Sequence, residues 1–275
     1  MNDTTINPHE DSHSEELRRQ KIIINKLDMS SPGKWIRAGW NDIKTTPGTS
    51  LAYGTLFAAV GMLLVYAYSS SSHMVFAITT GFLLLGPFLA VGLYAISRNS
   101  QDQVKCETKM SFFKGIKAGC GNPDCIAMYA LLLGIITVAW VRLSAILAAL
   151  FFNSALLTSH DMTVMELLFS ENSIGFLAMY IAIGGIIALF VFSISAISIP
   201  MIMDKEMDCI TTSMTSFKAV MKNKMPMIYW AILIVFFTGI GMATLGIGLI
   251  VTMPLIGHAT WHAYRDLIET NTPAV

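Results

Sequence analysis

The chain has few charged residues for its length: Asp, Glu, Lys and Arg make up 13% of its 275 residues. A soluble domain carries about 25% charged residues, whereas 54% of this sequence is hydrophobic. The formal net charge is zero, so the bulk electrostatic attraction on which nucleic-acid binding depends is missing. The composition therefore excludes an ordinary soluble domain, and we expect no nucleic-acid partner.

The N-terminal segment lacks the apolar core of a cleaved signal peptide. Residues 1–30 are polar, and we expect them to form a disordered or partly helical tail. Residues 31–268 are predicted to form a single transmembrane domain, with residues 269–275 as a C-terminal tail. Six apolar runs lie near or above the roughly 20 residues that cross a hydrocarbon core of about 30 Å. These runs cover approximately 49–69, 74–97, 126–152, 173–203, 227–245 and 246–264.

Lys and Arg are missing from connections 70–73 and 153–172 and from the turn near Thr244–Gly246. Except for Arg142, all basic residues lie before the first run, in the remaining connections or after the last run. The positive-inside rule therefore predicts a multi-pass protein with both termini and the basic loops in the cytoplasm. All four cysteines map to that reducing side, so we expect free thiols and no disulfide.

One pattern occurs three times along the chain. A basic amphipathic stretch (Lys34–Lys44, Ser111–Cys120 or Ser216–Met225) is followed by a proline and then by two apolar runs. We predict an all-α membrane protein in which six transmembrane helices form three degenerate helical hairpins. Each hairpin would follow a cytoplasmic interfacial helix, with Trp35 and Trp40 at headgroup depth. The alternative is that basic amphipathic stretches precede the spans of many multi-pass proteins without any repeat.

A proline lies in the returning helix of each predicted hairpin: Pro87, Pro200 and Pro254. Proline within a span frees a backbone carbonyl, which neighbouring helices or water must satisfy. We therefore predict a helix kink at each of these positions.

The histidines of the last run form the first candidate site. His258 and His262 are four residues apart, a spacing that places two metal ligands on one helix face. When the hairpins are aligned on their prolines, Asp204 and Asp208 occupy the corresponding positions. If the hairpins pack around a pseudo-axis, the four side chains would converge as a metal or proton site. The alternative is an interfacial aromatic and histidine belt with solvated aspartates.

Arg142 is the second candidate site because it lies inside an apolar run, where a charge is costly unless it is paired or hydrated. Glu166, in a predicted short helix of the following connection, is the preferred partner. In this interpretation, Arg142 and Glu166 form a structural ion pair. Alternatively, the Arg142 side chain extends to the outer membrane interface. A third interpretation is contact with an anion or a lipid headgroup.

The stretches LAYGTLFAAVGMLL, GFLLLGPFLAVGLYAISR and GLIVTMPLIGHATWHAYRDL carry a family resemblance. Over roughly residues 33–268, the chain resembles a numbered domain-of-unknown-function family of six-helix integral membrane proteins. Its motifs are GPFLAVGLY and HATWHAY. The resemblance implies the inner membrane of proteobacteria and implies no activity. Some family members are labelled as similar to the large subunit of cytochrome oxidase, but this chain lacks that subunit's intramembrane histidines.

Motifs of catalysis are missing as well: no Gly-rich phosphate loop, Ser-His-Asp arrangement or paired intramembrane carboxylate occurs. We therefore expect no enzymatic activity and no cofactor, and a metal or haem would have to use His258 and His262. The first hypothesis is an accessory or assembly subunit of a larger membrane complex, with lipids and other subunits as partners. The alternatives are a small-molecule or lipid transporter built from repeats, or a metal- or haem-binding membrane protein.

Overall fold

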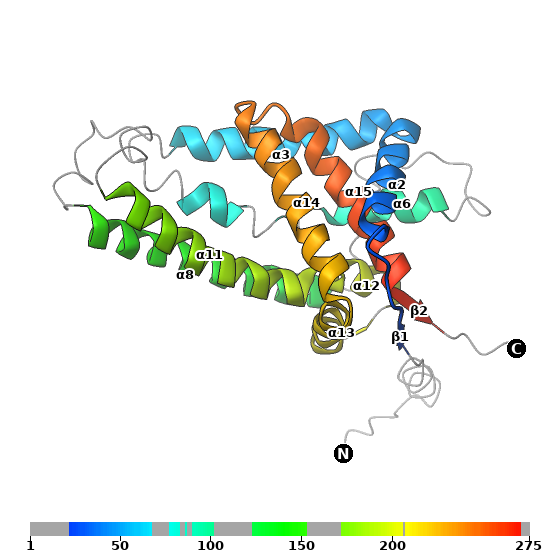
Figure 1. Cartoon of the computed structure of the whole chain (residues 1–275). Coiled ribbons are helices and arrows are strands. Elements are labelled where there is room, and N and C mark those ends of the chain that lie inside the picture. Colours follow the sequence, from blue (N-terminus) through cyan, green and yellow to red (C-terminus); the bar gives the residue numbers. More distant parts are fainter. Residues whose placement is uncertain are drawn as a thin grey trace, which may run out of the picture.

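The protein is mostly helical in the computed structural model (Figure 1), which describes residues 22–67, 77–82, 86, 90–101, 123–152, 172–205 and 207–270. The helices are α2 (Ser31–Thr45), α3 (Pro47–Ala67), α6 (Val91–Gln101), α8 (Pro123–Phe151), α11 (Ser173–Ser195), α12 (Ser198–Lys205), α13 (Cys209–Lys222), α14 (Lys224–Ala243) and α15 (Leu249–Leu267). The strands β1 (Ile22–Ile24) and β2 (Ile268–Thr270) pair antiparallel.

Within the described ranges, four helical stretches are long and apolar enough to cross a membrane: Pro47–Ala67, Asp124–Phe151, Ser173–Lys205 and Lys224–Ala243. They correspond to the first, third, fourth and fifth predicted runs. The second run is described only in part, as helical residues 77–82 and α6. The molecule is thus a helical protein with several apolar spans. The structure confirms neither six transmembrane helices nor the predicted arrangement in hairpins.

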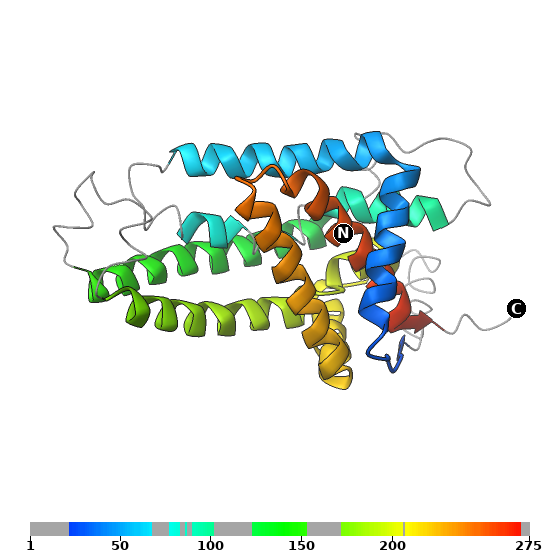
Figure 2. The same ribbon diagram turned by 45° about the horizontal axis from the view of Figure 1, so that its top comes forward.

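The helix α15, which covers most of the sixth predicted run, lies at the centre of the packing. It contacts α2, α3, α6 and α14, and the residues from Met253 to Trp261 are all buried. The views in Figures 1 and 2 place α2, α3 and α14 around it. Its composition mixes apolar residues with histidine, threonine and tryptophan because these side chains face other helices rather than lipid.

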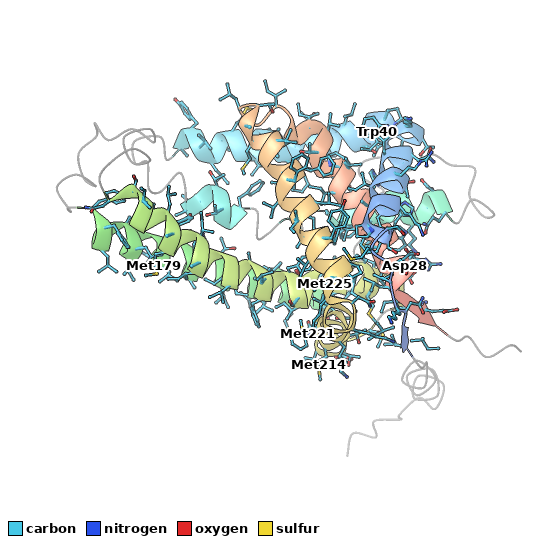
Figure 3. The ribbon with its side chains drawn as sticks, viewed as in Figure 1. Asp28, Trp40, Met179, Met214, Met221 and Met225 are labelled. Carbon is cyan, nitrogen blue, oxygen red and sulfur yellow. A yellow bond between two sulfur atoms is a disulfide. The ribbon has the colours of Figure 1, made fainter. Side chains whose placement is uncertain are left out.

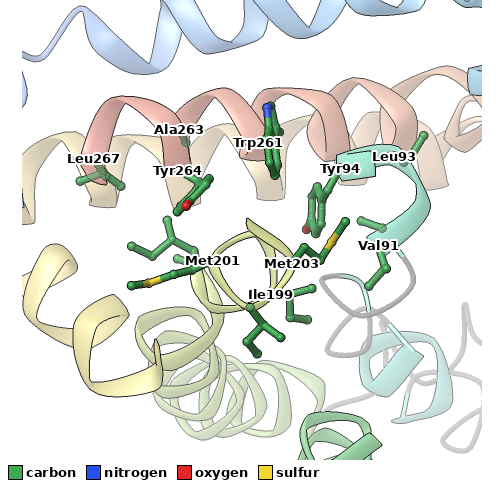
Figure 4. Close-up of a cluster of buried hydrophobic side chains, with 14 of the residues drawn as sticks. Val91, Leu93, Tyr94, Ile199, Met201, Met203, Trp261, Ala263, Tyr264 and Leu267 are labelled. Carbon is green, nitrogen blue, oxygen red and sulfur yellow. The ribbon is translucent and has the colours of Figure 1, made fainter. Parts of the chain in front are cut away.

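The core forms where the ends of three helices meet. The helices α6, α12 and α15 each contact the other two. In the sequence, α6 follows Pro87, α12 starts around Pro200, and α15 contains Pro254. Figure 4 shows Tyr94 of α6, Met203 of α12 and Trp261 of α15 in one buried cluster. The ends of the three predicted returning helices therefore share a single core.

Large apolar side chains cover the outer surfaces of α3, α8, α11 and α14. Figure 3 shows them projecting along these helices, with Met179 labelled on α11. Contiguous exposed apolar surface of this extent is typical of a membrane-facing region. The exposed set includes Leu56, Leu63 and Tyr66 of α3, Leu131, Ile135 and Val138 of α8, Ile181, Ile186 and Phe190 of α11, and Ile232, Val235 and Phe236 of α14.

The N-terminal strand corrects two expectations, an entirely helical fold and a tail that is disordered or partly helical up to residue 30. Residues Ile22–Ile24 pair with Ile268–Thr270, and the backbone N–H of Leu27 donates to Asn223 Oδ1 at 2.8 Å. Three consecutive β-branched residues favour an extended conformation, and Ile22 and Ile24 pack on the core. The last part of the predicted tail is therefore tied to the C-terminal end of α15.

The first predicted interfacial helix is α2, and its two tryptophans have different environments. Trp40 is 42% exposed, whereas Trp35 is 2% exposed. The Trp35 ring meets Trp230 edge to face at 5.6 Å between centroids, and its indole N–H donates to Asp266 at 2.8 Å. Trp35 therefore belongs to the protein core and is not a lipid-exposed ring, and headgroup depth stays a prediction for both tryptophans. The stretch Ser111–Cys120 lies outside the described residues.

The cysteines differ from the expectation of free thiols. Cys125 near the start of α8 and Cys209 at the start of α13 form a disulfide, with Cα atoms 5.6 Å apart. Both side chains are buried. The two residues are 84 positions apart in the sequence, so the contact depends on how α8 and α13 pack and could not be read from local spacing.

Candidate functional site: a buried polar chain around Asp42

A chain of polar side chains crosses the interior where α2, α3, α6 and α15 meet. Its innermost member is His258, whose side chain is fully buried. The Nε2 atom of His258 lies 2.9 Å from Ser50 Oγ of α3, and its Nδ1 atom lies 2.7 Å from Ser97 Oγ of α6. Both ring nitrogens are therefore engaged by hydroxyl groups of neighbouring helices.

The carboxylate of Asp42 links α2 to this chain. Ser97 Oγ donates to Asp42 Oδ2 at 2.6 Å, and His262 Nε2 lies 2.9 Å from the same oxygen. His258 Nδ1 is farther away, at 3.9 Å. Asp42 is 6% exposed, so its desolvation is costly unless such partners compensate for it.

The chain ends near the surface at Gln101 of α6. Its side-chain amide nitrogen lies 3.0 Å from His262 Nδ1, and its amide oxygen accepts from the Trp261 indole N–H at 2.9 Å. His262 is partly exposed. The polar chain thus runs from the buried Ser50 to a partly exposed histidine and glutamine.

The partners assign a direction to every hydrogen bond in the chain. Because the Ser97 hydroxyl donates to Asp42, its oxygen accepts from His258 Nδ1–H, and His258 Nε2 accepts from Ser50. The Gln101 amide donates to His262 Nδ1, so the Nε2–H of His262 donates to Asp42. Two series of donors therefore converge on one oxygen of the Asp42 carboxylate.

This arrangement suits the positioning of helices more directly than the binding of a metal. Every ring nitrogen of the two histidines has a protein partner. In the described part of the chain, no group of three or more His, Cys, Asp or Glu residues could hold a metal ion. The network joins four helices, of which only α2 and α3 are neighbours in the sequence. A fully satisfied buried network of this kind stiffens and specifies a core.

Asp204, predicted to approach the two histidines, lies in a different cluster. Its Oδ2 atom accepts from the Tyr264 hydroxyl at 2.6 Å. Three cations surround the carboxylate: Lys205 Nζ at 3.4 Å, Arg265 at 3.6 Å and Arg98 Nε at 3.9 Å. Arg98 also donates to the carbonyl of Met203 at 2.8 Å.

The three cations around Asp204 occupy the last turns of three helices. Arg98 is in the last turn of α6, Lys205 in that of α12 and Arg265 in that of α15. Each helix C-terminus carries a partial negative charge of about half an electron, which a basic residue neutralises. The cluster is therefore an electrostatic junction in which the positive charges balance one carboxylate and three helix ends.

Asp208 serves as the N-cap of α13. Its side chain accepts from the backbone N–H of Thr211 at 2.9 Å, an arrangement typical of aspartate before a first turn. This hydrogen bond from the Thr211 backbone lowers the pKa of the Asp208 carboxyl. The described contacts thus bring the two histidines to Asp42, whereas Asp204 and Asp208 have separate structural partners.

The two predicted kink prolines that the structure describes, Pro200 and Pro254, lie at different places in their helices. Pro200 is in the first turn of α12, a position at which proline is tolerated, and α11 ends just before it at Ser195. Side chains from other helices reach the carbonyls around this break, since Tyr129 donates to Ile194 and Ser216 donates to Ser193. Pro254 is inside α15 and buried, and Pro87 lies outside the described residues.

Arg142 points outward from α8. Its side chain is exposed, and within the described ranges it has neither an ion pair nor a hydrogen bond. Glu166, its predicted partner, lies outside those ranges, so the ion pair stays a prediction. Nine residues, or about 14 Å of helix, separate Arg142 from the end of α8 at Phe151.

Sequence reasoning missed Asp42, Ser50, Ser97 and Gln101. One signal was present: Asp42 is the single acidic residue in the basic stretch Lys34–Lys44. An isolated acid on the apolar side of an amphipathic helix is expected to have a buried partner. Serine is common in membrane helices, so nothing in the local sequence distinguishes Ser50 and Ser97 from other serines of the chain.

Comparison with known proteins gives a family and nothing more specific. No curated protein and no solved structure matches the chain. The matching family model covers the motif GPFLAVGLY but ends before HATWHAY. Over residues 74–204, the chain matches the family DUF2189, described as a predicted integral membrane protein, which confirms the resemblance to an integral membrane family of unknown function.

Proposed function

We propose that this protein is a non-catalytic accessory or assembly subunit of a larger inner-membrane complex. Its buried polar side chains hold helices together, as the convergence of Ser97 and His262 on Asp42 illustrates. Its outer surface is apolar over four helices. These features support a protein that acts through the helix surfaces it offers to other membrane subunits.

The proposal rests on the outer face of the helices α8 and α11, which is the surface that another subunit would contact. The two helices pack along each other through a cluster that includes Trp140, Phe176 and Tyr180. Figures 1 and 2 show the pair extending away from α14 and α15. On α11, Gly185 has open space where a Cβ atom would lie, beside the exposed Ile181 and Ile186. Small residues on such a face allow another helix to approach closely.

Co-purification of the tagged protein from native membranes in mild detergent tests the proposal. We expect a stoichiometric membrane-protein partner, and we expect Gly185→Leu to reduce its recovery about tenfold, a loss of roughly 1.4 kcal/mol in affinity. The matched control is Gly239→Leu on α14, because Gly239 also has open space around a built Cβ. Equal partner recovery with both variants, or recovery of the protein alone, would count against the proposal.

We also propose that the chain crosses the membrane six times with both termini in the cytoplasm. Most described Lys and Arg residues lie on α2, on α13 and on the last turns of α6, α12 and α15. Figure 1 shows these elements at the same end of the molecule as β1 and β2. That asymmetry supports the orientation expected from the positive-inside rule.

Labelling of single cysteines in intact cells tests the orientation. Leu245 is 85% exposed in the turn between α14 and α15, and Lys218 is exposed on α13. In a chain without its native cysteines, we expect an impermeant thiol reagent to label Leu245→Cys and to leave Lys218→Cys unlabelled until the cells are opened. The reverse pattern would show that the protein has the opposite orientation.

Transport of lipids or small molecules is a second candidate function, favoured by the exposed Arg142 on α8. A guanidinium group on a membrane-facing helix can reach the interface and contact anionic headgroups. Metal or haem binding by His258 and His262 stays a hypothesis from the sequence. Recovery of bound lipid without a protein partner would favour transport over the accessory role.

A further inference from the structure

The outward face of α2 is a basic and aromatic surface. Lys34, Arg37, Asn41 and Lys44 recur at spacings of three or four residues, which places them on one side of the helix. Trp40 is exposed beside them, and Lys44 Nζ lies 5.9 Å from the centroid of its ring. The single acid of α2, Asp42, is buried on the opposite side.

A groove of about 520 Å³ lies along this face. It is lined by Lys34, Arg37, Ala38, Trp40, Asn41 and Lys44. Over the part of the chain that the structure describes, none of the three cations in this groove forms an ion pair. The groove therefore combines three positive charges, an amide and an indole without any acidic group.

The position of α2 relative to α3 restricts what can occupy the groove. Helix α3 begins at Pro47, directly after α2, and Figures 1 and 2 show α2 running across the direction of α3. If α3 crosses the bilayer, α2 lies along the membrane surface over about 22 Å, the length of a 15-residue helix. Tryptophan prefers this depth, and cations there attract lipid phosphates.

We propose that the outward face of α2 binds the phosphate groups of anionic phospholipids, with Lys34, Arg37 and Lys44 as phosphate contacts. The Trp40 ring lies beside the glycerol and upper acyl region, and the Asn41 amide donates to headgroup oxygens. Lipid, rather than a soluble anion, is the committed ligand because the exposed indole would otherwise have no apolar surroundings. This binding is independent of the proposed accessory role.

Titration of the purified full-length protein with phosphatidylglycerol in a neutral detergent tests the site. Trp40 fluorescence, obtained as the difference between wild type and Trp40→Phe, reports occupancy, and native mass spectrometry counts the retained lipids. Replacement of Lys34, Arg37 and Lys44 by glutamine together is expected to weaken binding about a hundredfold. Each cation near an anionic lipid surface contributes roughly a fivefold gain in affinity. Phosphatidylcholine is expected to bind weakly to wild type.

The matched control changes the same net charge elsewhere, with Lys26, Lys218 and Lys224 replaced by glutamine. These three residues are also exposed, and we expect this variant to keep wild-type affinity. An equal loss in both triple variants would show general charge attraction and would overturn the proposal. Inorganic phosphate or an acidic peptide that displaces the lipid at comparable concentration would show a soluble ligand or a protein partner, and would overturn it as well.

Discussion

Replacement of Gly54 by alanine is expected to destabilise the protein by about 3 kcal/mol, the upper range for overpacking a tightly packed core. A Cβ atom built at Gly54 would overlap the carbonyl oxygen of Ile250 and would lie 2.8 Å from its Cα. Backbone atoms of α15 cannot rotate away as a flexible side chain can. Pro254 lacks the N–H that would bond this carbonyl, so the Ile250 oxygen has no donor from its own helix at the point where α3 approaches it.

The effect of Gly54→Ala is measured as the thermal unfolding midpoint of the purified protein in detergent, with a fall on the order of 10 °C expected. Gly61→Ala, in the same helix, is the control because the nearest atom to its built Cβ is Phe82 Cε1 at 3.9 Å. The control is expected to be neutral or more stable, since alanine is favoured over glycine in a helix by about 1 kcal/mol. Similar midpoints for both variants would refute the proposed contact between α3 and α15.

The apolar runs predicted the most hydrophobic helices well because lipid-facing residues need no specific partner. Predicted runs 49–69, 126–152 and 227–245 agree with α3, α8 and α14 to within a few residues. The fourth run was predicted as one helix, but α11 and α12 are separate at Ala196. Pro200 explains the separation, since a helix loses one backbone bond at proline. For lipid-facing helices, composition and proline positions are therefore enough to predict most of the helix boundaries.

The buried site was less predictable because its members come from four different helices. Two histidines at positions i and i+4 were recognised from their spacing, yet their carboxylate partners were predicted from the repeat alignment as Asp204 and Asp208. The structure instead brings Asp42 to within 2.9 Å of His262, across 220 residues of sequence. That contact depends on the packing of α2 on α15, where a Cβ at Gly39 would meet the Ala259 nitrogen at 2.8 Å. The spacing of two residues along one helix does not indicate which other helix will pack against them.

Removal of the Asp42 carboxylate has the second large expected effect. In Asp42→Ala, the Ser97 hydroxyl and the His262 N–H lose their common acceptor within a buried region. An unsatisfied buried donor costs about 1–3 kcal/mol, so the two together predict a loss of roughly 3 kcal/mol in the free energy of unfolding. Asp42→Asn keeps one oxygen acceptor in place, and we expect it to retain part of that stability. The measurement is again the unfolding midpoint of the purified protein.

A double-mutant cycle separates the hydrogen bond from the general effect of changing α2. If Asp42 and His262 are partners, Asp42→Leu combined with His262→Leu should cost less than the sum of the single changes. The expected coupling is about 0.5–3 kcal/mol, the range for residues in one network. The exposed neighbour Asn41→Leu with His262→Leu provides the additive control, because Asn41 faces away from the network. Strict additivity in the Asp42 cycle would show that the carboxylate does not hold α2 to α15. A stable Asp42→Ala protein that loses its cellular phenotype would instead favour a proton site at His258 and His262.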